Sequence, residues 1–170
     1  MDEHALRLTD GVVALRPPDE GDLAAIAGGI EDPDVVRWIG PPEGTAAETL
    51  ALNRARWAAG SPTFAICESD DACVGHVWAN VPPDEPSAAA IGYWLLPAAR
   101  GRGLATRAVR LLCEWLVEER GITTLRLFTD PGNAASQRVA ERSGFTRIGL
   151  EKGREELDGR SIDRLRFERP

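Results

Sequence analysis

The sequence has little histidine and cysteine and no long hydrophobic run. Its 170 residues include 2 histidines and 3 cysteines, and none of these stands in the spacing of a zinc site or a redox motif. The longest apolar run, from Ala88 to Ala99, contains a glycine and a proline. It falls short of the roughly 20 residues that a membrane-spanning helix needs. We therefore expect no metal, no membrane segment and reduced cysteines.

Positive charge is also in the minority. The chain has 20 Lys and Arg against 27 Asp and Glu, which gives a formal net charge of −7. A nucleic-acid-binding protein usually presents a basic face, so we expect no nucleic-acid partner. An acidic surface favours cationic ligands such as an amine, although a charge that serves only solubility explains the composition equally well.

The first residues, Met1 to His4, are acidic and lack the basic and apolar regions of a signal peptide. An odd number of cysteines does not suit a disulfide framework. Both observations favour a cytoplasmic protein.

Hydrophobic patterning predicts an α+β fold in one domain that spans residues 1–170, with its core between 11 and 168. Short apolar runs between turn residues predict a mixed, mostly antiparallel sheet of about seven strands at 12–15, 63–68, 73–81, 89–96, 123–129, 145–151 and 161–167. Helical periodicity predicts about four flanking helices at 19–30, 45–59, 104–120 and 134–142.

Turn and cap residues set several of these boundaries. Thr45 and Glu48 have the spacing of a capping box, and Gly121 stands where the long helix should stop. The first helix is expected to end around Gly28-Gly29, and a loop broken by proline and glycine should follow through Trp38. Asp158-Gly159 predicts a hairpin turn before the last strand.

The most informative segment lies between an apolar strand and the long helix. The first N–H groups of a helix have no partner within it, and the helix dipole adds roughly half a positive charge there. Glycines let the backbone approach a bulky anion, and arginines add charge. The pattern predicts a pyrophosphate site made by Arg100, Gly101, Arg102, Gly103, Leu104, Ala105 and Thr106.

Two familiar phosphate motifs do not fit this segment. No Gly-Lys-Ser/Thr follows it, as a nucleoside-triphosphate loop requires. Thr106 stands where a dinucleotide fingerprint has Gly or Ala, and the neighbouring strands show no βαβ alternation. The spacing Arg100-x-x-Gly103-x-Ala105 instead resembles the acyl-CoA signature of the GNAT superfamily of N-acetyltransferases. A basic turn that only caps a helix is the alternative.

Further motifs extend the resemblance over residues 11–168. Asn133 and Ser136, followed by Gly144-Phe145, resemble the second motif of the superfamily. Together with Leu15-Arg16-Pro17 and Tyr93-Trp94-Leu95, they resemble the branch that includes ribosomal-protein N-terminal acetyltransferases (RimJ/RimL type). The resemblance implies acetyl-CoA as cosubstrate, with direct attack on its thioester by an amine. The acceptor would be a protein N-terminal amine or a small-molecule amine.

The resemblance also implies roles for single residues. The backbone N–H of Leu95 would face the thioester carbonyl, between strands that splay apart to admit pantetheine. Ser136 would be the general acid or contact the CoA sulfur, and Asn133 would contact CoA. Plain helix capping is the alternative for this pair. Ala140 stands where many relatives have a catalytic tyrosine, and residues 88–90 are alanines where relatives often have a glutamate.

His76 is the main candidate for a general base, although a structural role is the alternative for a strand histidine, and Glu85 in the proline-rich loop is a weaker candidate. A lysine-type amine of pKa about 10.4 costs roughly 4–5 kcal/mol to deprotonate at pH 7, against about 1 kcal/mol for an α-amine near pKa 8. The missing carboxylate therefore favours either an acceptor amine of low pKa or loss of the proton through water.

Trp38, Trp78 and Tyr93 are candidates for the acceptor pocket, where Trp38 would stack on a cation. Packing without contact to a ligand is the alternative for the two tryptophans. The absence of the tyrosine and the glutamate keeps a second function open, a non-catalytic domain that binds acyl-CoA as a sensor or with a partner. The sequence leaves the choice between monomer and homodimer open.

Overall fold

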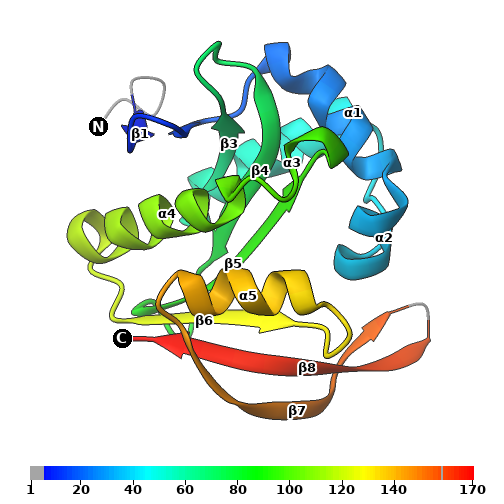
Figure 1. Ribbon diagram of the computed structural model, residues 1–170, viewed down its shortest axis with the longest axis vertical. Helices are drawn as coiled ribbons and strands as arrows, with labels where there is room; N and C mark the ends of the chain where they lie inside the picture. Colours follow the sequence, from blue (N-terminus) through cyan, green and yellow to red (C-terminus); the bar gives the residue numbers. More distant parts are fainter. Residues whose placement is uncertain (1–5, 158) are drawn as a thin grey trace.

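Eight strands form one sheet in the computed structural model, which describes residues 6–157 and 159–170 (Figure 1). Their order is β1-β2-β3-β4-β5-β6-β8-β7, and the described neighbouring pairs are antiparallel except β5–β6. The strands are β1 (Leu8–Thr9), β2 (Ala14–Arg16), β3 (Thr63–Cys67), β4 (Cys73–Asn80), β5 (Ala88–Leu95), β6 (Thr124–Thr129), β7 (Thr146–Leu157) and β8 (Arg160–Arg169).

Five α-helices accompany the sheet, so the predicted α+β class is confirmed with one more strand and one more helix than expected. The helices are α1 (Leu23–Glu31), α2 (Pro33–Ile39), α3 (Ala46–Ala58), α4 (Leu104–Arg120) and α5 (Ala134–Arg142), with short 3-10 turns η2 (Glu20–Asp22) and η3 (Pro97–Ala99). The capping box of Thr45 and Glu48 is confirmed, and Gly121 ends α4 with a φ of 65°. No helix of the described residues is long and apolar enough to cross a membrane.

Successive side chains of β4 and β5 point to opposite faces of the sheet, and different helices pack on each face. Val77, Ile91 and Leu95 join the buried residues of α4 in the main core. His76 and Trp94 occupy the positions in between, so their side chains point to the opposite face, which α1 and α3 cover. In Figure 1, α4 and α5 accordingly lie in front of the sheet and α3 lies behind it.

The segment through Trp38 is helix α2, so the prediction of a loop there is wrong. Asp32 caps this helix, because its Oδ1 accepts hydrogen bonds from the N–H groups of Asp34 and Val35 at 3.1 and 3.0 Å. Pro33 occupies the first helical position, where its missing N–H has no cost. The proline therefore starts a helix here, and Trp38 has a fixed position on it.

Helix α1 continues to Glu31, so the predicted stop at Gly28-Gly29 is also wrong. A Cβ at Gly29 would lie 2.6 Å from the indole ring of Trp94, which is closer than atoms can pack. The glycine therefore lets α1 approach β5 and does not end the helix. Close approach between elements is a tertiary requirement that a local pattern does not reveal.

The last hairpin is longer than predicted. Strand β7 extends to Leu157 instead of Glu151, and its pairing with β8 shifts register between Glu151 and Glu155. The added residues are mostly charged, so they show no alternation of apolar residues. Asp158 of the predicted turn lies outside the described residues, while Gly159 has a φ of 71°.

Gly75 on β4 gives a direct test of the packing between β4 and β5. A Cβ there would overlap the carbonyl oxygen of Trp94 and lie 2.9 Å from Cδ2 of Leu95. We expect Gly75→Ala to lower the free energy of unfolding in urea by about 2 kcal/mol. Gly149→Ala is the matched control on β7, because no atom lies within 4 Å of its Cβ position. Equal effects of the two substitutions would contradict this packing.

His76 is 2% exposed beneath α3, and Asn53 Nδ2 lies 3.5 Å from its Nδ1. Burial lowers the pKa of His76 from 6.5 to about 4. Between these values the unfolded chain binds a proton that the folded chain does not. The free energy of unfolding should therefore fall as the pH drops from 6.5 towards 4. His76→Gln should make this fall shallower in urea titrations; a slope unchanged from the wild type would refute the assignment.

Candidate active site

A cavity of about 730 Å³ opens where β5 and β6 separate. The two strands pair from Ala88–Thr124 to Ile91–Leu127 and no further. Beyond that point β5 stays paired with β4 as far as Leu95, so residues 92–95 keep one edge of their backbone facing the cavity. Unpaired backbone N–H and C=O groups in such a gap are ready to bind an extended amide-containing ligand.

The turn before α4 lies at one end of this cavity. Gly101 and Gly103 have φ values of 73° and 78°, and a Cβ at either would meet no atom within 4 Å. The first hydrogen bond that closes the helix runs from the N–H of Arg107 to the carbonyl of Gly103, at 3.3 Å. The N–H groups of residues 101–106 therefore have no acceptor within the helix. The side chains of Leu104 and Ala105 are buried beneath them. An exposed backbone with free donors fits a pyrophosphate.

The arginines of this turn are already paired. Arg100 donates to the carbonyl of Leu95 at 3.0 Å and to the carboxylates of Asp32 and Asp34 at 2.7 and 3.1 Å. The hydrogen bond from Arg100 holds the pKa of Asp32 below its usual value. Arg102 forms an ion pair with Glu68. The positive potential of the turn therefore comes mainly from backbone groups and the helix dipole.

Asn133, Ser136 and Tyr93 meet at the other side of the gap. Asn133 caps α5, because its Oδ1 accepts the N–H of Ser136 at 3.1 Å. The phenol of Tyr93, on β5, donates a hydrogen bond to Ser136 Oγ at 3.1 Å. Burial raises the pKa of Tyr93, so the phenol stays protonated at neutral pH. Ala140 itself is buried in the core, and the phenol near Ser136 comes from a strand instead.

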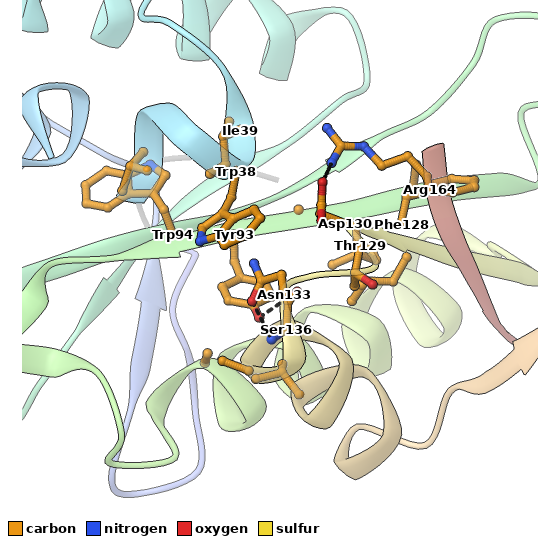
Figure 2. Close-up of a pocket in the computed structure, with 18 of the residues that line it drawn as sticks. Trp38, Ile39, Tyr93, Trp94, Phe128, Thr129, Asp130, Asn133, Ser136 and Arg164 are labelled. Carbon is orange, nitrogen blue, oxygen red and sulfur yellow. Dashed lines mark hydrogen bonds and ion pairs between the residues drawn. The ribbon is translucent and has the colours of Figure 1, made fainter. Parts of the chain in front are cut away.

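The opposite side of the sheet forms a second wall of the cavity. Trp38 on α2 and Trp78 on β4 contribute to it, together with Phe128, Asp130 and Arg164. In Figure 2, Trp38 and Arg164 lie on one side of β5 while Asn133 and Ser136 lie on the other. The lining of the cavity therefore comes from both faces of the sheet.

Nine of the predicted site residues line this one cavity. They are Trp38, Trp78, Tyr93, Leu95, Arg100, Gly101, Ala105, Asn133 and Ser136. Arg102, Gly103, Leu104 and Thr106 belong to the turn beside it but are not part of its lining. His76 is separated from it, since the ring is buried between α3 and β4 and packs on Trp94 at a centroid distance of 5.0 Å.

Sequence reasoning missed five charged residues of the cavity, which are Asp34, Asp130, Arg154, Glu155 and Arg164. Asp130 directly follows β6, and polar residues at the carboxyl end of a parallel strand commonly line ligand sites, so its position held a usable signal. Arg164 lies inside β8 among many other charged residues, and its burial to 7% exposure had no sequence signal.

Comparisons with known proteins agree with this geometry. Residues 13–146 match the family model of the acetyltransferase (GNAT) domain. A stretch of 76 residues is 40% identical to the L-2,4-diaminobutyric acid acetyltransferase of Streptomyces coelicolor, and covers 42% of this chain and 45% of that enzyme. The chain thus matches less than half the length of this curated relative.

Two solved structures share the whole fold. Mycobacterium smegmatis RimJ, in complex with CoA-disulfide, is 28% identical with a TM-score of 0.82, over 96% of this chain and 84% of its own. The RimL ribosomal L7/L12 alpha-N-protein acetyltransferase in complex with coenzyme A is 23% identical with a TM-score of 0.83, over 96% and 97% of the two chains. With a family match that covers most of its length, the chain belongs to the acetyltransferase (GNAT) domain family.

Proposed function

We propose that this protein transfers an acetyl group from acetyl-CoA to a primary amine. The observation that carries the proposal is the open edge of β5, which runs from the free N–H groups before α4 to the Tyr93–Ser136 pair. Family membership supports it, as do relatives named for acetylating ribosomal proteins or diaminobutyric acid.

Binding of the cosubstrate would use backbone groups throughout. The N–H groups of residues 101–106 would hold the pyrophosphate, and residues 92–95 would pair with the pantetheine amides. The backbone N–H of Leu95 would donate to the carbonyl oxygen of the thioester, where negative charge develops. Acetyl-CoA supplies an activated acetyl group, so no covalent link to the protein is required.

Ser136 would protonate the leaving sulfur. Because Ser136 Oγ accepts a hydrogen bond from Tyr93, its own hydrogen is free to point at a second acceptor in the cavity. In the transfer, the C–N bond of the amide forms and the C–S bond breaks. The amine loses one proton to water, and the sulfur takes one from Ser136, which water then reprotonates. Tyr93 positions the serine through its hydrogen bond.

A non-catalytic acyl-CoA-binding domain predicts a different result. If acetyl-CoA raises the melting temperature but no amine in a broad panel causes release of CoA thiol, the proposed transferase activity fails. Thiol release followed by mass spectrometry of the product would exclude the sensor function.

Gly103→Ala tests the binding of CoA at the turn. We expect the Kd for CoA to rise at least about 10-fold in isothermal titration calorimetry, because a Cβ would enter the space where the anion approaches the backbone. Gly121→Ala is the matched control at the other end of α4, where φ is also positive and the Cβ position is also open. Loss of CoA affinity in both variants, or in neither, would count against the turn as the binding site.

Ser136→Ala tests proton donation to the sulfur. We expect kcat to fall on the order of 10²-fold, while CoA affinity changes little. Tyr93→Phe should lower kcat by a smaller factor of about 10, since it removes one hydrogen bond to the serine. The double variant should be no slower than Ser136→Ala alone, because Tyr93 acts through Ser136. Fully additive losses would show that Tyr93 acts independently.

A further inference from the structure

Asp130 and Arg164 face each other in the second wall of the cavity (Figure 2). Arg164 Nη1 and Asp130 Oδ2 form an ion pair at 3.8 Å. This distance is too long for a hydrogen bond. Each group therefore keeps hydrogen-bonding capacity that the other does not use.

Arg164 is a buried cation with free donors. Its side chain is 8% exposed, and its Nε and Nη2 both donate to Glu155 Oε2, at 3.2 and 2.9 Å. Nη1 has no acceptor within hydrogen-bond distance among the described residues. Glu155 already occupies the Nε–Nη2 edge of the guanidinium, so a further carboxylate would bind at Nη1 through a charge-assisted hydrogen bond.

Asp130 offers the complementary charge. Its Oδ1 accepts the N–H of Gly132 at 2.7 Å, and this hydrogen bond orients the carboxylate. Its Oδ2 faces Arg164 and accepts no hydrogen bond from the described residues. A carboxylate with a free oxygen suits an ammonium group. The neighbouring rings of Trp38 and Phe128 already carry the guanidinium groups of Arg37 and Arg154 over one face, at 4.3 and 3.6 Å from the ring centroids. Asp130 is therefore the group that would bind the ammonium.

Oδ2 of Asp130 and Nη1 of Arg164 lie 3.8 Å apart without a hydrogen-bond partner among the described residues, and they match the two charges of an amino acid head group. A peptide N-terminus would offer its ammonium to Asp130 but only a neutral carbonyl to Arg164. An ammonium held by a carboxylate also has a raised pKa and stays protonated, so it is a poor nucleophile. The amine that receives the acetyl group should then be a second one.

We infer that the acceptor is a small diamino acid. Its carboxylate binds Arg164, its α-ammonium binds Asp130, and its side-chain amine reaches through the strand gap to the thioester. This inference rests on the proposed acetyltransferase activity and names the substrate class for the same cavity.

The test compares four acceptor types with acetyl-CoA by thiol release: short diamino acids, their carboxamides, amino acids with one amine, and short peptides with free N-termini. We expect kcat/KM for the diamino acids to exceed that for their carboxamides on the order of 10²-fold. Peptides or monoamino acids that react as well as the diamino acids would overturn the inference while leaving the transferase activity intact. If no acceptor releases thiol, the proposed function itself fails.

Arg164→Gln adds a test on the residue itself. It should bring the ratio of kcat/KM between acid and carboxamide close to one, mainly through KM, while CoA affinity is retained. Arg164→Lys should keep part of the preference. Arg166→Gln is the matched control on the same strand and outside the cavity lining, and it should leave the ratio unchanged. If Arg164→Gln lowers kcat/KM equally for the acid and the carboxamide, the role of Arg164 is overturned. If the variant does not fold, the ratio measured for the wild type still tests the substrate class.

Discussion

The separation of β5 from β6 after Ile91 is the constraint on which the rest of the site depends. If β5 and β6 stayed paired along their whole length, their backbone groups would bond to each other and none would remain for a ligand. The separation is compatible with a stable sheet because β4 continues to pair with β5, and β8 continues to pair with β6. One gap thus provides backbone donors and the facing starts of α4 and α5.

Arg100 connects the two halves of this site. Its guanidinium holds the carboxylates of Asp32 and Asp34 at the start of α2, and it also binds the carbonyl of Leu95. Helix α2 carries Trp38 in one wall of the cavity, while Arg100 belongs to the turn before α4. A residue expected to neutralise phosphate therefore makes a second set of contacts here, which fixes α2 relative to the turn. Because Asp32 is also the cap of α2, this ion pair and the helix support each other.

Features set by neighbouring residues could be read from the sequence, and features set by distant contacts could not. The turn with Gly103 and the helix stop at Gly121 are local, so α4 and its free N–H groups were predicted closely. Pro33 and Gly29 were misread because their effect depends on the Asp32 cap and on contact with an indole ring. Seven lining residues, among them Tyr93 and Ser136, were found through motif spacing, whereas Arg164 acquires its burial only from the pairing of β6, β8 and β7.

The absence of an evident general base is explained if the acceptor is a diamino acid. His76 stays neutral near pH 7 but is buried away from the cavity, and Asp130 would hold its ammonium in the charged form. In a short diamino acid, the charge of the first ammonium lowers the pKa of the second amine, because like charges disfavour each other. Each unit of that lowering removes about 1.4 kcal/mol from the cost of deprotonation. Asp130 would then contribute by orienting the diamino acid, and the charge of the first ammonium would let the second amine lose its proton to water without a dedicated base.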